Sequence, residues 1–111
     1  MIVANVPGSG VDVLTRLVTA RLGVELGQHI VVDNRIDNRP GAGTAYGMEI
    51  GRNAAPDGYT LNSAATASLA IAPLIYRKQP QSVLDDYEFI SLFAITPNVL
   101  VVTPTLPLKT R

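Results

Sequence analysis

The chain has 111 residues, with nine basic and nine acidic side chains, so its formal net charge at pH 7 is zero. This length supports one domain that buries roughly 65% of its unfolded surface, and it excludes a protein of several domains. Scattered basic residues argue against nucleic-acid binding, and the absence of cysteine excludes disulfides and thiolate metal sites. No apolar stretch reaches the ~20 residues of a membrane span, and Met1 leads into Ile2 without the basic segment of a signal peptide.

The first third of the chain predicts a strand, a helix and a second strand. Residues 2–6 form an apolar run that ends at Pro7-Gly8, and residues 30–32 are all β-branched, so both runs predict strands. Helical spacing between them predicts a helix that ends at Gly23 or Gly27 and packs an aliphatic stripe on the sheet. The stripe consists of Val13, Leu14, Leu17, Val18 and Leu22.

The rest of the chain continues the alternation. Residues 44–54 predict a second helix, residues 59–63 a third strand, and residues 64–75 a third helix that Pro73 interrupts. Two apolar runs, residues 89–95 and 99–103, predict the last strands. Strands that alternate with helices predict an α/β fold, with a mostly parallel sheet flanked by helices. Ligands of such sheets bind beyond the carboxyl ends of the strands.

Two short glycine loops lie where a predicted strand gives way to a helix: residues 7–12 and residues 40–44. Glycine permits positive φ, and the helix that follows offers unpaired N–H groups at the positive end of its dipole. The pair therefore predicts a site for a carboxylate or a phosphate, with hydroxyl groups after the third strand adding donors. The candidate ligand-binding residues are Gly8, Ser9, Gly10, Asp12, Gly41, Ala42, Gly43, Thr44, Ser63 and Thr66.

Other interpretations of these loops stay open. Each is also an ordinary strand-to-helix turn that merely needs glycine. The Gly8-x-Gly10 pattern, with Asp33 after the next strand, is also consistent with a dinucleotide-binding unit, but Val13 stands where that motif needs a small residue.

Catalysis finds no support in the sequence. His29 stands just before an apolar strand, and Asp85-Asp86 lies in a polar connection, so neither forms a recognisable acid–base group. The sequence predicts no catalytic residue, no metal site and no cofactor.

Five ordered blocks carry a resemblance to a known family. They are Val-Pro-Gly-Ser-Gly-Val-Asp-Val-Leu-Thr-Arg-Leu (6–17), Leu-Gly-Gln-His-Ile-Val-Val-Asp-Asn-Arg (26–35), Pro-Gly-Ala-Gly (40–43), Ala-Pro-Asp-Gly-Tyr-Thr-Leu (55–61) and Thr-Pro-Asn-Val-Leu-Val-Val (96–102). In this order they resemble the Bug family (TctC-like), the periplasmic solute-binding receptors of tripartite tricarboxylate transporters.

The resemblance implies a non-enzymatic receptor with the type II periplasmic-binding-protein fold. Such a receptor clamps a small mono- or dicarboxylate between two lobes in the periplasm and delivers it to a membrane permease. Residues 1–111 would form a single, incomplete N-terminal lobe that ends at the crossover to a second lobe. The two glycine loops and the segment 63–68 would contact the ligand carboxylate.

This chain also departs from the family pattern. Ser9 and Thr44 stand where the family has glycine, and residues 36–39 read as an insertion that repeats Asp-Asn-Arg. A single lobe leaves a sheet edge and apolar surface exposed, which predicts self-association. The alternatives to a receptor fragment are a degraded remnant with reduced binding, a nucleotide-binding βαβ domain, and an interaction module that dimerises through an open sheet edge.

Overall fold

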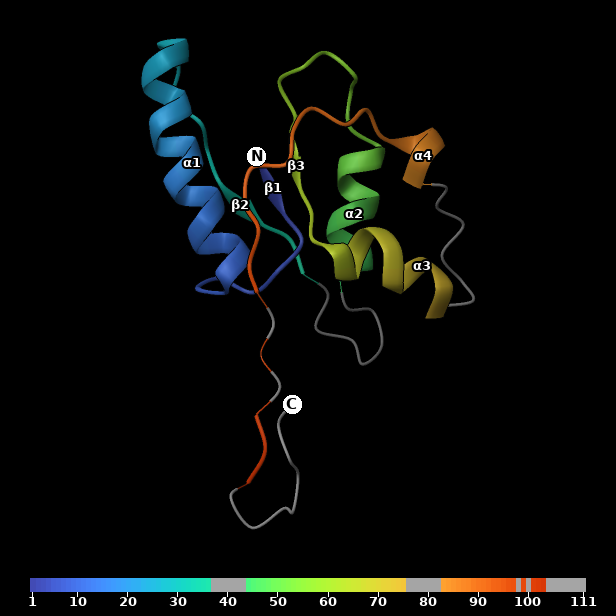
Figure 1. Ribbon diagram of the computed structural model, residues 1–111. Helices are drawn as coiled ribbons and strands as arrows, with labels where there is room; N and C mark the ends of the chain where they lie inside the picture. Colours follow the sequence, from blue (N-terminus) through green and yellow to red (C-terminus); the bar gives the residue numbers. More distant parts are fainter. Residues whose placement is uncertain (37–43, 76–82, 98, 100, 104–111) are drawn as a thin grey trace.

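The computed structural model describes residues 1–36, 44–75, 83–97, 99 and 101–103, and its centre is a parallel sheet of three short strands (Figure 1). The strands are β1 (Ile2–Val3), β2 (Asp33–Asn34) and β3 (Asn62–Ser63), in the order β2-β1-β3. Ile2 aligns with Asp33 on one side and with Asn62 on the other. The parallel α/β architecture predicted from the sequence is therefore confirmed.

Helices cover both sides of this sheet. Helix α1 (Gly10–Leu26) connects β1 to β2, and helix α2 (Ala45–Arg52) precedes β3. Figure 1 shows α1 and α2 on opposite sides of the strands, as two right-handed crossovers in opposite directions require. After β3 come the π-helical turn η1 (Ala67–Ile71), helix α3 (Ala72–Ile75) and helix α4 (Val83–Asp86). The predicted helix over residues 64–75 is thus realised as η1 and α3.

The ends of α1 follow local signals in the sequence. Ser9 is the N-cap residue, and its Oγ accepts a hydrogen bond of 3.4 Å from the N–H of Asp12. Gly27 closes the helix with φ of 63°, in the left-handed region, and its N–H reaches the carbonyls of Gly23 and Val24. Glycine suits this position because it has no side chain to strain. Of the two predicted stopping points, the structure therefore uses Gly27.

The orientation of α1 differs from the prediction. Its buried residues are Asp12, Thr15 and Thr19, whereas Val13 and Leu17 of the predicted aliphatic stripe are 47% and 65% exposed. A polar neighbour in the sheet explains the difference: the Oγ1 of Thr15 lies 2.7 Å from the Oγ of Ser63 on β3. A buried hydroxyl needs such a partner. The helix therefore turns its hydroxyl stripe to the sheet, whereas Val13 and Leu17 of the aliphatic stripe are exposed and Leu14, Val18 and Leu22 are half-buried.

Helix α2 packs closely against the sheet through a glycine. A Cβ placed on Gly47 would lie 2.6 Å from the Cβ of Ala4 and 2.5 Å from the carbonyl oxygen of Arg35. Met48 beside it is the largest fully buried side chain among the described residues. Helix α4 is held to α2 by a contact of 3.4 Å between Arg52 Nε and Asp86 Oδ2. The hydroxyl of Tyr87 also donates a hydrogen bond to the carbonyl of Met48.

Three of the predicted strands are shorter than expected or displaced. In the runs 2–6 and 59–63 only Ile2–Val3 and Asn62–Ser63 pair, and the run 30–32 lies just before the paired residues of β2. The displacement follows from the register, because the N–H of Asp33 donates to the carbonyl of Met1 (2.9 Å). The prediction of a strand at 30–32 is therefore wrong by a shift of two or three residues.

The two late strands are not formed in the described part of the chain. Residues 89–95 and the described residues of 99–103 belong to no helix or strand, and most of their side chains are exposed. The core of the described residues is correspondingly small: its apolar members are Ile2, Val3, Ala4, Met48 and Ala72. No described helix has both the length and the hydropathy needed to cross a bilayer.

Candidate functional site

The described candidates for ligand binding lie at the carboxyl end of the sheet. Because the strands are parallel, their carboxyl ends meet at one edge of the sheet, the lower edge in Figure 1. The loop with Gly8 and Ser9 follows β1, and Thr66 follows β3 at the start of η1. Thr44 is the N-cap residue of α2, and its side chain makes no capping hydrogen bond. Gly41, Ala42 and Gly43 of the second loop lie outside the described residues.

The first loop has the backbone geometry of an anion site. Gly8 has φ of 80°, a conformation that side-chain-bearing residues rarely adopt, and the space around Gly8 and Gly10 is open. Gly10 and Val11 open α1, so their N–H groups have no carbonyl acceptor within the helix. Two N–H groups without an acceptor therefore lie at the positive end of a helix of 17 residues, next to the carboxyl edge of the sheet.

Asp12 is fully engaged in holding this loop. Its carboxylate accepts hydrogen bonds from the N–H of Gly8 (2.8 Å), the guanidinium of Arg16 (3.1 Å from Nε) and the amide of Asn34 (2.9 Å). Arg16 also donates to the Oδ1 of Asn34 (2.7 Å), and Asn34 donates to the carbonyl of Asn5 (3.1 Å). This network, which we call the Asp12 network, consists of Asn5, Gly8, Asp12, Arg16 and Asn34. It ties the loop to α1 and to the end of β2.

The network keeps Asp12 ionised and neutralises its charge. The hydrogen bond from Arg16, followed by those from Gly8 and Asn34, lowers the pKa of Asp12 from 3.8 to about 2. The ion pair is close, with Arg16 Nη2 3.0 Å from Asp12 Oδ1. The carboxylate beside the loop therefore presents little net charge to an incoming anion.

Acidification is expected to weaken the fold through Asp12. A lowered pKa means that the folded state favours the carboxylate, so this stabilisation is complete above the ordinary pKa of 3.8 and is lost as the pH falls through about 2. In the Asp12→Asn variant the group no longer titrates. Its stability should therefore fall less between about pH 5 and about pH 2.5 than the stability of the wild type. Urea unfolding at about pH 5 and about pH 2.5 measures both falls. Parallel losses in the two proteins would contradict this role of Asp12.

Ser63 lies behind the loop. Its side chain is 1% exposed, and its hydroxyl is paired with that of Thr15 under α1. Thr66 is exposed, whereas Ser68 is buried and bonds to the backbone of Ala65. Of the three hydroxyl residues Ser63, Thr66 and Ser68, Thr66 is therefore the exposed one.

Sequence reasoning missed Arg16 and Asn34. The spacing of Asp12 and Arg16 is a signal for an ion pair on one helix face, but nothing in the local pattern links either residue to Asn34. That contact depends on the parallel register, which sets Val3 beside Asn34.

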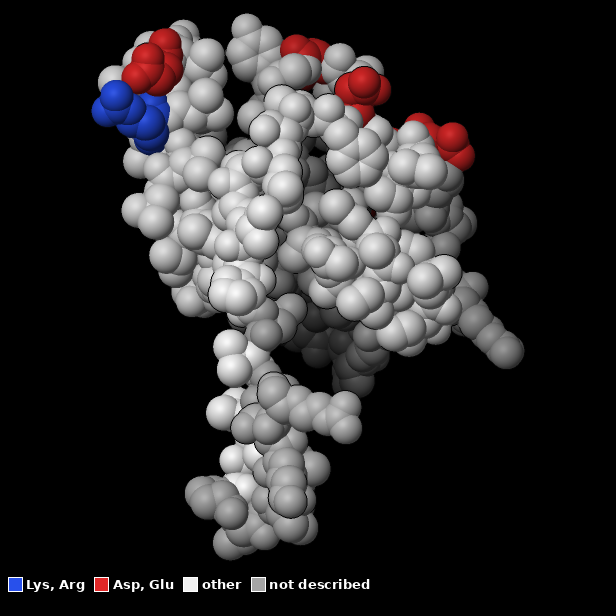
Figure 2. All heavy atoms as spheres, viewed as in Figure 1, with Lys and Arg blue, Asp and Glu red and all other residues white. Residues whose placement is uncertain are grey.

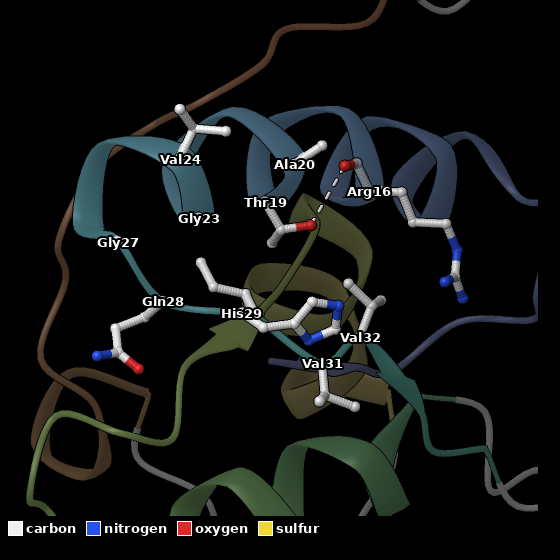
Figure 3. A pocket seen from close by; sticks show the side chains of 11 residues that line it. Arg16, Thr19, Ala20, Gly23, Val24, Gly27, Gln28, His29, Val31 and Val32 are labelled. Atoms are coloured by element: carbon white, nitrogen blue, oxygen red, sulfur yellow. Dashed lines mark hydrogen bonds between the residues drawn. The ribbon is translucent and has the colours of Figure 1, made fainter.

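A shallow groove of about 690 Å³ lies between the second half of α1 and the segment 28–32 (Figure 3). Its apolar lining includes Ala20, Val24, Val31 and Val32, and the His29 ring lies among these side chains in Figure 3. Across the described residues no three His, Cys, Asp or Glu side chains gather as a metal site would require.

Comparisons with known proteins give one consistent family. The family described as "Tripartite tricarboxylate transporter family receptor" matches residues 14–111. The protein BugT of Bordetella pertussis is 38% identical over 109 residues, which cover 97% of this chain and 32% of BugT. A UPF0065 protein of Bordetella bronchiseptica is 38% identical over 102 residues, covering 92% of this chain and 29% of that protein.

The chain spans about a third of the length of these curated relatives. No solved structure matches it significantly. The match to BugT confirms the resemblance to the Bug family, and the family match covers nearly all of the residues. The chain therefore belongs to the family of tripartite tricarboxylate transporter receptors.

Proposed function

We propose that this chain is part of an extracytoplasmic solute-binding receptor and that it forms one wall of a site for a small mono- or dicarboxylate. Its family is a class of transport receptors and not of enzymes. The observation that carries the proposal is the loop of Gly8, Ser9 and Gly10, whose open geometry precedes the N-terminus of α1. Backbone N–H groups at such a position bind carboxylates without any catalytic group.

The charges around the loop support this choice of ligand. An unpaired aspartate at position 12 would repel a carboxylate, but three hydrogen-bond donors, from Gly8, Arg16 and Asn34, already occupy its oxygens. The N–H groups of Gly10 and Val11 take no part in this network and have no acceptor within the helix. These two N–H groups can therefore donate hydrogen bonds to the carboxylate of a ligand.

The complete site would use more than this loop. We place Gly41, Ala42, Gly43 and Thr44 on the same wall before α2, with Thr66 at its edge and Ser63 supporting it from behind. The fold would be one lobe of a type II periplasmic binding protein, and residues 1–111 would end near the crossover to a second lobe. In this proposal the receptor works in the periplasm and delivers its ligand to the membrane permease of the transporter.

Calorimetric titration of the chain with acetate, succinate and citrate tests the proposal. We expect weak binding of at least one carboxylate, since a single wall leaves the ligand partly hydrated. Butane-1,4-diol, which has the length of succinate without its charge, should give no heat. NAD serves as a further arm, because protection by NAD alone would instead favour a nucleotide-binding domain. Absence of heat with every carboxylate would refute binding by this chain.

Two matched variants locate the site. Thr66→Val removes a hydroxyl at the carboxyl end of β3, and Thr60→Val removes one from an exposed residue before β3. Loss of one hydrogen bond to a charged ligand costs about 1.5–3 kcal/mol, so Thr66→Val should weaken carboxylate binding by roughly tenfold or more. Thr60→Val should bind as the wild type does. Equal affinities in the two variants would remove Thr66 from the site.

A further inference from the structure

The side chain of Asn34 uses nearly all of its hydrogen-bonding capacity at the carboxyl end of β2. Its amide nitrogen donates to Oδ1 of Asp12 (2.9 Å) and to the carbonyl of Asn5 (3.1 Å), and its Oδ1 accepts from Nη2 of Arg16 (2.7 Å). Donors and acceptors match at all three contacts, and both N–H bonds of the amide are used. Asn34 therefore has no donor left for a ligand and can influence one only through its neighbours.

The contact with Asn34 fixes the orientation of the Asp12 carboxylate. Rotation of a carboxylate about its terminal torsion is soft, so a partner on one oxygen alone leaves the group free to turn. Asn34 and Nη2 of Arg16 (3.0 Å) hold Oδ1, while Oδ2 accepts from the N–H of Gly8 (2.8 Å). Gly8 has φ of 80° and shapes the first glycine loop. Through Asp12, Asn34 therefore acts on the conformation of this loop.

The main chain beside Asn34 is also in contact with α2. The N–H of Arg35 donates to the carbonyl of Val3 (2.9 Å). The carbonyl oxygen of Arg35 would lie 2.5 Å from a Cβ on Gly47, in the first turn of α2. The end of β2 therefore contacts both helices whose N-termini lie at the carboxyl edge of the sheet. Asn34 joins α1 to the same short segment that seats α2.

The placement of β2 in the sequence supports a functional role for Asn34. Residues 30–32 are all β-branched, yet the strand pairs Asp33 and Asn34 with β1, and these two residue types are depleted in strands. Positions where the fold overrides a local preference are expected at functional sites. Asparagine can donate and accept at once, which an aliphatic residue cannot. The register places this capacity beside Val3, next to the first glycine loop.

We propose that Asn34 is a positioning residue of the carboxylate site. It orients the carboxylate of Asp12, which holds the N–H of Gly8 and thereby fixes the first glycine loop. The N–H groups of Gly10 and Val11, which follow in this loop, are then kept in place for the ligand. This role rests on the proposed function, because it concerns how the donors of that site are held. Asn34 should therefore control carboxylate affinity without touching the ligand.

Exchanging the amide and the carboxylate tests this role. Asn34→Asp removes both N–H donors and sets a second carboxylate beside that of Asp12. For whichever of acetate, succinate and citrate binds the wild type most tightly, the dissociation constant should rise by roughly tenfold or more. A double variant that combines Asp12→Asn with Asn34→Asp lets the two groups change places. A hydrogen bond between positions 12 and 34 can then form again, so much of the lost affinity should return.

Asn53→Asp is the matched control for Asn34→Asp. It makes the same chemical change at an exposed residue that caps the far end of α2, so its affinity should equal that of the wild type. On the face shown in Figure 2, the charged side chains of the described residues lie along the upper rim, and the lower part of the described surface is uncharged. Charges on this face therefore do not mask the charge added at position 34, at the lower edge of the sheet.

Amide hydrogen exchange at Gly8 measures the positioning without a ligand. The N–H of Gly8 should exchange faster in Asn34→Asp than in the wild type, because its acceptor is no longer held. It should slow again in the double variant. Gly58 has the same φ of 80° in a distant loop, and its exchange should not change. If Asn34→Asp fails to fold, Asn34→Ala removes the same donors without adding a charge and should show the same two effects.

The two measurements separate this role from carboxylate binding itself. A wild type that binds no carboxylate would refute the proposed function, and exchange at Gly8 would then decide the role of Asn34 alone. Three results would each overturn that role. They are wild-type affinity in Asn34→Asp, unchanged exchange at Gly8 in this variant, and a double variant that binds no better than Asn34→Asp does.

Discussion

Replacement of Gly47 by valine is expected to destabilise the fold by about 3 kcal/mol, at the upper end of what overpacking costs. Even a single Cβ at this position would meet the Cβ of Ala4 and the carbonyl of Arg35 at 2.6 and 2.5 Å. Both neighbours belong to backbone or to a short side chain, so neither can rotate away. Helix α2 would have to move off β1, and its first turn would leave the carboxyl edge of the sheet. Urea unfolding measures the loss, and carboxylate binding should fall with it.

Gly10→Ala is the matched control for this substitution. Nothing lies within 4 Å of a Cβ at Gly10, and alanine is a good helix former at the first position of α1. Its free energy of unfolding should stay within about 0.5 kcal/mol of the wild type. If Gly47→Val unfolded at the same urea concentration as Gly10→Ala, the close packing of α2 on β1 would be wrong.

The parts of the fold that the sequence predicted well are those encoded by neighbouring residues. Helix α1 begins after Ser9 and ends at Gly27, because a capping hydroxyl and a left-handed glycine act within a few residues. The alternation of apolar runs and glycine loops likewise predicted the parallel sheet. These signals are local, so they can be recognised in one sequence without knowing the tertiary contacts.

The errors concern contacts between distant residues. The aliphatic stripe of α1 was expected to face the sheet, but the hydroxyl of Thr15 meets Ser63, 48 positions away. The segment 30–32 has a stronger strand pattern than Asp33–Asn34, yet the pairing with β1 selects Asp33 and Asn34. Periodicity identifies which residues share a face, but the face that becomes buried depends on what the opposite element offers.

In the candidate site, too, the features encoded by neighbouring residues were predicted and the contacts between distant residues were not. The loop of Gly8, Ser9 and Gly10 was predicted as a strand-to-helix turn, and the structure confirms that placement. The contact of Asp12 with the N–H of Gly8 is a finding of the structure. Arg16 and Asn34 complete the Asp12 network only because α1 and β2 lie side by side. Binding by the loop, and by the candidate residues before α2, stays a prediction.

Met48→Ala is expected to cost about 3 kcal/mol, within the range for truncating a buried methionine. The Met48 side chain is 1% exposed and belongs to a small apolar core, so few neighbours can collapse into the space that it leaves. Its sulfur also accepts a hydrogen bond from the amide of Asn62 (3.6 Å), and this amide would lose its partner. The midpoint temperature of thermal unfolding should fall by roughly 10 °C or more for a chain of this length.

Met48→Leu separates the lost volume from the lost sulfur. Leucine nearly conserves the volume, so this variant should cost less than about 1.5 kcal/mol, and the difference from alanine reports the cavity. The hydrogen bond from Tyr87 ends on the main-chain carbonyl of Met48, so it persists in both variants and α4 stays attached to α2. Equal unfolding temperatures for the two variants would show that Met48 does not fill the core. The space between α2 and the sheet would then have to be filled by side chains other than Met48.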